Sequence, residues 1–117
     1  MSDTSPRPLE LTHESMGGAV VVGLQGSADA TEVPVLRRRL EELLDARTEQ
    51  IVLDLSGMDF IGSLGLGVLV EAHRRMQTYQ GHLRLVNPNP RVRSVLETTQ
   101  LTALFPIFDS VQGAMGA

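Results

Sequence analysis

Residues 51–70 read IVLDLSGMDFIGSLGLGVLV, and this stretch decides the fold. Residues 51–55 form a short and nearly all-apolar run, which is typical of a central strand covered on both faces. After a short turn, Ser63, Gly65 and Gly67 stand at the start of an expected helix. The first turn of a helix leaves backbone N–H groups without helical acceptors, so this junction could hold a phosphoryl group or contact a partner protein.

The composition fits one domain without disulfides. The chain has 117 residues, of which 42% are hydrophobic, and this is enough for a single core. It has no cysteine, which excludes disulfides and thiolate metal sites. A net charge of −4 argues against general nucleic-acid binding, which needs a basic patch. No apolar run approaches the length of a membrane span, so we expect a cytoplasmic protein without membrane insertion.

The hydrophobic pattern predicts an α/β domain over residues 9–117, preceded by a flexible tail over residues 1–8. Two strands, one with Leu9 and Leu11 and one over residues 19–25, would be joined by a turn at Gly17-Gly18. Three further strands are expected at 51–55, 83–86 and 105–108, and helices are expected after Thr31, after Ser63, at Pro90 and near Ser110. The order ββαβαβαβα predicts a mixed central sheet of about five strands with about four helices.

The first helix has two candidate N-caps. Asp29 with Glu32 has capping-box spacing, but it would put Pro34 at the fifth helical position, where the missing N–H removes a helical bond. Thr31 as the cap puts Pro34 third, without that loss. We therefore expect Thr31 to cap the helix and the Asp29 side chain to be free in the loop. The inward stripe of this helix is expected to consist of Val33, Leu36, Leu40, Leu43 and Leu44.

No catalytic or metal-binding constellation can be assembled from the sequence. His13, His73 and His82 lack the spacing of a zinc site, and no Ser/His/Asp arrangement can be proposed. The run G-S-L-G-L-G lacks the lysine of a phosphate-binding loop and differs in spacing from the dinucleotide fingerprint. The sequence therefore favours a binding module that is not an enzyme and needs neither cofactor nor metal.

Three residues at the junction allow alternative interpretations. Ser63 could be a simple N-cap, or it could accept a phosphate that the positive end of the helix dipole would favour, and the two roles are compatible. Gly67 costs about 1 kcal/mol relative to alanine in a helix, which indicates either tight helix-strand packing or a docking partner. Leu64, if exposed, would favour a hydrophobic contact with a partner, whereas a buried Leu64 would only pack the helix.

Residues 54–75, DLSGMDFIGSLGLGVLVEAHRR, resemble the signature of bacterial anti-sigma factor antagonists of the STAS-domain family. The turn from Gly26 to Asp29 is similar to the Gly-x-x-Asp turn of that family, and residues 87–110 resemble its C-terminal stretch. Two positions depart from the pattern. Gly62 stands where the family usually has Asp, and Leu64 stands where Ser, Thr or Ala is usual.

The resemblance implies an anti-sigma factor antagonist that acts by partner switching. Its partner would be an anti-sigma factor of the histidine-kinase-like ATPase type that is also a serine kinase. The unmodified antagonist would bind this partner and free the sigma factor, phosphorylation at Ser63 would end binding, and a PP2C-type phosphatase would restore it. The resemblance implies Ser63 and Asp29 as site residues, and the full set of residues that we expect to bind the partner is Asp29, Gly62, Ser63, Leu64, Gly65 and Gly67.

The resemblance leaves a second role open. STAS domains also occur as small non-catalytic subunits of lipid-transport ATPases, where the hydroxyl at the helix start would serve an interface without phosphate. Nucleotide binding by the domain itself is disfavoured by the acidic balance and by the lack of a lysine near Ser63. The family likeness allows a monomer or a weak homodimer, because the edge strand of the N-terminal hairpin could pair across a two-fold axis.

Overall fold

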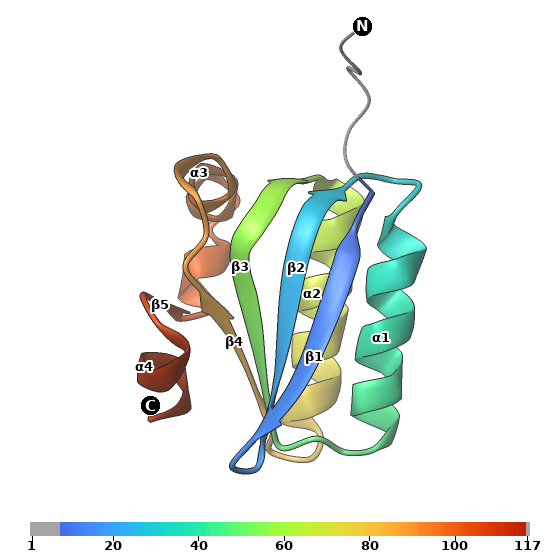
Figure 1. The fold of residues 1–117 in the computed structure, drawn as a ribbon, viewed down its shortest axis with the longest axis vertical. Coiled ribbons are helices and arrows are strands. Elements are labelled where there is room, and N and C mark those ends of the chain that lie inside the picture. Colours follow the sequence, from blue (N-terminus) through green and yellow to red (C-terminus); the bar gives the residue numbers. More distant parts are fainter. Residues whose placement is uncertain (1–7, 117) are drawn as a thin grey trace, which may run out of the picture.

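Five strands pair in chain order, β1-β2-β3-β4-β5, to form the central sheet (Figure 1). The computed structural model describes residues 8–116, so residues 1–7 of the expected tail and residue 117 lie outside the described part. The strands are β1 (Glu10–Met16), β2 (Ala19–Ala28), β3 (Gln50–Ile61), β4 (His82–Val86) and β5 (Ile107–Phe108). β1 is antiparallel to β2, and the remaining pairs are parallel, which confirms the predicted mixed sheet.

The turn between β1 and β2 forms where the sequence predicts it. Met16 pairs with Ala19, and the two residues between them, Gly17 and Gly18, have φ values of +52° and +88°. A tight hairpin turn that follows the twist of its strands needs positive φ at both positions, and glycine adopts such φ values without steric cost. This hairpin places β1 at one edge of the sheet.

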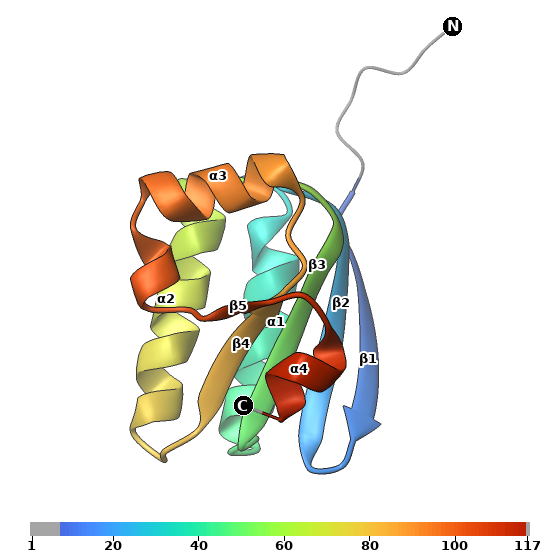
Figure 2. The same cartoon turned by 90° about the vertical axis from the view of Figure 1, so that its left-hand side faces the viewer.

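Four α-helices occupy the two faces and one end of the sheet (Figures 1 and 2). They are α1 (Val33–Asp45), α2 (Ser63–Gln77), α3 (Pro90–Thr98) and α4 (Val111–Met115), and a short 3-10 helix, η1 (Leu101–Ala103), precedes β5. α1 and α2 lie side by side on one face, α4 packs on the opposite face, and α3 lies across the end at which α2 begins. The predicted order of elements is therefore confirmed, with η1 as an addition.

The main core lies between the sheet and the helices α1 and α2. All five residues of the predicted α1 stripe are buried there. In β2, Val22 and Leu24 contribute to this core, whereas Val21 faces the smaller cluster beneath α4. The central strand β3 is buried on both faces, because Ile51 and Leu53 join the main core and Val52 joins the smaller cluster. This double burial explains why residues 51–55 are nearly all apolar.

β3 is longer than the sequence predicts. The expected strand ends at Leu55 and leads into a short turn, but the observed strand continues to Ile61. The extension exists because β2 also continues to Ala28, and the two strands stay paired through register shifts. Gly57 allows a close approach at one of these irregularities, since a Cβ there would lie 2.8 Å from Cγ of Gln25. Ser56 and Gly57, a pair that is typical of a turn, thus lie inside the paired strand β3.

Candidate functional site

The ends of β2 and β3 bring the two predicted binding segments together. Ala28 and Ile61 are register partners at the ends of these parallel strands, and the Gly62 N–H donates a 3.3 Å hydrogen bond to the carbonyl oxygen of Ala28. The loop that starts at Asp29 and the helix that starts at Ser63 therefore leave the sheet from neighbouring positions. Loops at the carboxyl ends of parallel strands are the usual place for binding sites in α/β proteins.

Ser63 is the first residue of α2, and its side chain is exposed. The N-cap position is taken by Gly62, whose backbone is extended and offers no side-chain cap. The interpretation of Ser63 as the N-cap is therefore wrong, because the bond from Gly62 to β2 keeps Gly62 extended and lets the helix begin only at Ser63. Within residues 8–116 the Ser63 hydroxyl has no hydrogen-bond partner, so it is available to another molecule.

Backbone amides at the start of α2 are also unpaired. The first helical hydrogen bond runs from the Leu66 N–H to the carbonyl oxygen of Gly62, at 3.0 Å. The N–H groups of Ser63, Leu64 and Gly65 precede it and have no acceptor among the described residues. Together with the positive end of the helix dipole, these donors favour an anionic group on or near the Ser63 oxygen.

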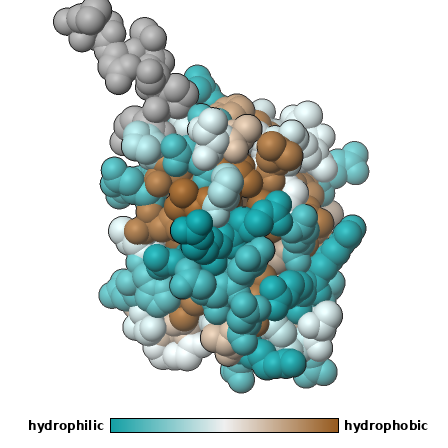
Figure 3. Space-filling view, turned by 90° about the vertical axis from the view of Figure 1, so that its right-hand side faces the viewer, coloured by the Kyte–Doolittle hydropathy of each residue, from teal (hydrophilic) through white to brown (hydrophobic). Residues whose placement is uncertain are grey.

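Exposed apolar side chains flank Ser63. Among residues 8–116, three large hydrophobic residues are exposed, and two of them are Leu64 at 59% and Phe60 at 40%. Leu64 is thus exposed, so helix packing does not explain it, and a hydrophobic contact with a partner stays a prediction. On the face drawn in Figure 3, hydrophobic surface gathers in the upper half, towards the end where α1 and α2 begin, and hydrophilic surface dominates lower down.

The two glycines inside α2 have different surroundings. Gly65 is buried, and a Cβ there would lie 2.9 Å from Cγ1 of Ile61, so close packing of the helix on β3 requires glycine. Gly67 is exposed, and a Cβ there would meet no atom within 4 Å. Packing within the described chain therefore explains Gly65 but not Gly67. For Gly67 the alternative of a docking partner stays a prediction.

Asp29 is not free in its loop. Its carboxylate accepts hydrogen bonds from the N–H of Thr31 at 3.0 Å, the hydroxyl of Thr31 at 2.7 Å and the N–H of Glu32 at 3.2 Å. The N-cap of α1 is Glu32, which places Pro34 within the first two helical positions. The expectations of a Thr31 cap and a free Asp29 are both wrong, because the short Asp side chain folds back on the turn that precedes the helix.

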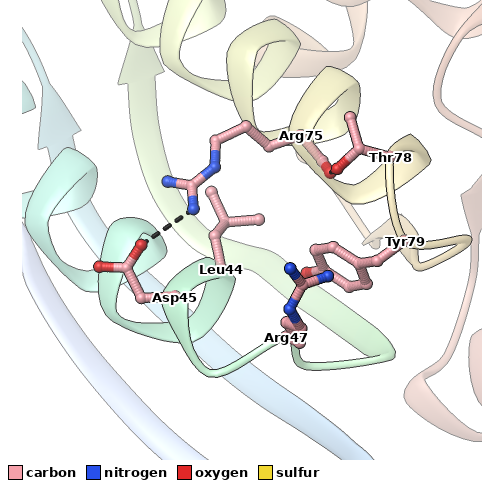
Figure 4. A pocket seen from close by; sticks show the side chains of 6 residues that line it. All are labelled: Leu44, Asp45, Arg47, Arg75, Thr78 and Tyr79. Atoms are coloured by element: carbon pink, nitrogen blue, oxygen red, sulfur yellow. Dashed lines mark hydrogen bonds and ion pairs between the residues drawn. The ribbon is translucent and has the colours of Figure 1, made fainter.

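A pocket of about 180 Å³ lies at the other end of α1 and α2 (Figure 4). It is lined by Leu44, Asp45, Arg47, Arg75, Thr78 and Tyr79. Asp45 and Arg75 form an ion pair at 2.9 Å, and the Arg47 guanidinium lies 5.9 Å from the centre of the Tyr79 ring. None of the residues predicted to bind a partner lies in it. Both helices end here, and the negative ends of their dipoles oppose an anionic ligand.

Tyr79 links the two helices at this pocket. Its hydroxyl donates a 3.0 Å hydrogen bond to the carbonyl oxygen of Thr48, just beyond α1. Burial raises the pKa of Tyr79 above its ordinary value, against the opposing effects of Arg75 and Arg47. We assign this cluster a structural role, which sequence reasoning missed because its residues follow no motif.

The described residues contain neither a clustered set of metal ligands nor a membrane-spanning helix. Within residues 8–116, no group of three or more His, Cys, Asp or Glu side chains is placed to hold a metal ion. None of the helices in the same range has the length and apolar character needed to cross a membrane.

The sequence profile of the STAS domain matches residues 11–114, from β1 into α4. This chain belongs to the STAS domain family. The resemblance of residues 54–75 to that family is thereby confirmed. Among curated STAS relatives, BtrV of Bordetella bronchiseptica is 30% identical, over 93% of this chain and 94% of its own length. The Anti-sigma F factor antagonist of Paenibacillus polymyxa is 29% identical, over 92% of each chain.

Solved STAS structures have the same fold. An anti-sigma factor antagonist from Mycobacterium paratuberculosis superposes with a TM-score of 0.85 at 25% identity, covering 92% of each chain. SpoIIAA in its unphosphorylated form covers 91% of this chain and 93% of its own, with a TM-score of 0.79 at 22% identity. SpoIIAA in its phosphorylated form has a TM-score of 0.72 at 21% identity, and the match covers 92% of this chain and 97% of its own. At these identities, the likeness to SpoIIAA concerns the fold alone.

Proposed function

We propose that this STAS protein is an anti-sigma factor antagonist, which binds an anti-sigma factor through the surface at the start of α2. The proposed contact surface consists of Asp29, Gly62, Ser63, Leu64, Gly65 and Gly67, and Ser63 is the proposed site of reversible phosphorylation. Relatives along nearly the whole chain carry this function in their names, including the antagonist of Paenibacillus polymyxa. The proposal extends their function to this chain and assigns residues to it.

The exposed hydroxyl of Ser63 is the observation that carries the proposal. It lies at the first position of α2 and has no hydrogen-bond partner within residues 8–116. A kinase can therefore reach it without unfolding the chain. The unpaired amides of the first turn would stabilise the phosphate once it is attached.

Phosphorylation would then change binding without changing the fold. A phosphate adds about −1.5 to −2 charges at neutral pH, and the positive end of the α2 dipole tolerates such charges. A partner surface that covers Ser63 would instead have to remove water from the phosphate, which is costly without a matching cation. The modified chain would stay folded and lose its partner, and this is the behaviour of a binary switch.

The proposed partners follow from the resemblance to the family. The anti-sigma factor would be a histidine-kinase-like ATPase that also phosphorylates Ser63, and a PP2C-type phosphatase would remove the phosphate. Asp29 is half-buried and already bonded to the turn before α1, so in this scheme it orders the loop that borders the partner. Gly62 and Gly65 would act through the backbone, by placing Ser63 and packing α2 on β3.

Capture from native lysate tests the proposal. Immobilised wild type, Ser63→Ala, Ser63→Asp and the control Ser110→Asp are compared, and retained proteins are identified by mass spectrometry. Ser110 caps α4 on the opposite face of the sheet, so the control adds the same charge far from Ser63. We expect a histidine-kinase-like ATPase on all variants except Ser63→Asp, and phosphorylation of wild type but not Ser63→Ala by that ATPase. A transporter ATPase retained by all four would contradict the proposal.

A further inference from the structure

Two exposed apolar side chains lie around the start of α2. Leu64 is 59% exposed, and Phe60, at the end of β3, is 40% exposed. Both residues lie within three positions of Ser63 in the sequence. Hydration of such side chains is unfavourable, so an exposed leucine next to a proposed binding residue points to a contact with another protein.

The chain segment that carries Phe60 and Leu64 has no charged residue. Residues 60–70 contain no Asp, Glu, Lys or Arg, and the first turn of α2 has no acidic residue. The sequence places Asp59 before this stretch and Glu71 after it. A partner that covers the start of α2 therefore meets no ionic group of this chain between these two residues. Apart from the Ser63 hydroxyl, the side chains of this stretch can offer a partner apolar contact only.

The helix holds the apolar side chain beside an open surface. Ser63, Leu64 and Gly67 are all exposed, and positions three and four apart on a helix are neighbours. Because a Cβ at Gly67 would meet nothing within 4 Å, the space over Gly67 is open. A partner can approach the α2 backbone there and close around Leu64. Since the helix already orders this residue, little backbone entropy is lost on binding.

We infer that Leu64, supported by Phe60, is the anchor of this interface, and that the partner presents an apolar pocket lined by aliphatic or aromatic side chains. The inference rests on the proposed function and adds the chemistry by which the anti-sigma factor kinase recognises this particular chain. A short side chain at position 64, such as the Ser, Thr or Ala that is usual in the family, could not fill such a pocket. Leu64 is thus a specificity determinant next to the phosphorylation site.

This anchor also changes how phosphorylation acts. A phosphate on Ser63 would lie one residue from a side chain that has to enter an apolar pocket, so binding would strip water from the phosphate. Salt screens repulsion between exposed charges but does little to a desolvation cost. Both the binding of the unmodified chain and its loss on phosphorylation are therefore expected to depend only weakly on salt.

Calorimetric titration with the purified kinase tests the inference. The probe is the histidine-kinase-like ATPase captured by wild type, loaded with ADP so that Ser63 stays unmodified. The chains are wild type, Leu64→Ser, Leu64→Gln, Leu64→Met and Val35→Ser. Val35 is the matched control, because it is 42% exposed but lines a groove with Leu11 and Arg38 on the β1 side of α1. Circular dichroism checks that each variant is folded.

We expect both polar Leu64 variants to raise Kd by about tenfold or more, and Leu64→Met and Val35→Ser to stay within about threefold of wild type. The wild-type Kd should change by less than about threefold between low and high salt. Unchanged affinity of the folded polar variants, with Ser63→Asp still impaired, would overturn the anchor and leave the proposed function standing. A steep salt dependence of the wild type would also overturn it. A kinase that does not bind wild type would overturn both.

Discussion

The Gly62 N–H donates a hydrogen bond to the carbonyl oxygen of Ala28, with the nitrogen and oxygen 3.3 Å apart. This bond is the last link between β2 and β3 before the chain turns into α2. It keeps Gly62 extended, so that the helix begins at Ser63, and it places the loop after Ala28 beside that helix start. Two segments more than thirty residues apart in the sequence thereby form one surface.

Substitution of the two glycines of α2 by alanine should change the stability of the fold in opposite directions. Gly65→Ala forces a Cβ to within 2.9 Å of the buried Ile61 side chain, and we expect it to destabilise the fold by about 1–3 kcal/mol. Gly67→Ala adds a Cβ in open space, and we expect it to stabilise the helix by about 0.5–1 kcal/mol. Urea unfolding measures both. Equal effects of the two substitutions would contradict the packing described for α2.

Asp29 should contribute to stability as well as to binding. Its carboxylate accepts three hydrogen bonds from the turn before α1. Asp29→Ala removes them all, and we expect a loss of about 1 kcal/mol in the free energy of unfolding. Asp29→Asn keeps an acceptor oxygen and should lose about half of that or less. If Asp29→Ala unfolds at the same urea concentration as wild type, the bonds contribute nothing and Asp29 acts only on the partner.

Tyr79 offers a direct optical test, because the chain has one tyrosine and no tryptophan. Burial raises the pKa of Tyr79 above 10.0 in the folded protein, against the opposing charges of Arg75 and Arg47. An absorbance titration at high pH should therefore give a midpoint above 10.0 for the folded chain. In concentrated urea the midpoint should fall to about 10. A folded midpoint below the unfolded one would mean that the two arginines outweigh burial.

The same pKa shift predicts how stability changes at alkaline pH. A pKa that is raised in the folded state means that the fold favours the protonated hydroxyl, which donates to Thr48. The stabilisation is complete below the unfolded pKa of about 10 and is lost as the pH rises through the folded pKa. Tyr79→Phe lacks this titration, so its free energy of unfolding should fall less than that of wild type over this range. Parallel curves for the two proteins would contradict the assignment.

Local chemistry made much of the fold predictable. The third helix begins at Pro90 as predicted, because proline suits the first turn and Asn89 before it accepts a 2.8 Å hydrogen bond from the Val92 N–H. The Gly17-Gly18 turn was predictable for a similar reason, since both residues need positive φ. The buried stripe of α1 followed from its helical spacing.

The parts that sequence reasoning missed depend on pairing between distant segments. The extension of β3 to Ile61 needs the second half of β2 as a partner, and nothing within residues 56–61 signals it. The displacement of the cap from Ser63 to Gly62 follows from the bond to Ala28, which is equally non-local. The residues assigned to the candidate site from the sequence stay a prediction, and their geometry could not be read from the sequence. Exposure of Leu64 and open space at Gly67 could be read only from the structure.

The central claim is that Ser63 governs binding and not folding. The most direct test measures, for wild type, Ser63→Asp and the control Ser110→Asp, both the Kd for the anti-sigma factor kinase and the free energy of unfolding. We predict that Ser63→Asp raises Kd by more than about tenfold while its unfolding free energy stays within about 1 kcal/mol of wild type, and that Ser110→Asp changes neither. A Ser63→Asp chain that binds like wild type, or that loses stability in proportion to binding, would contradict the account.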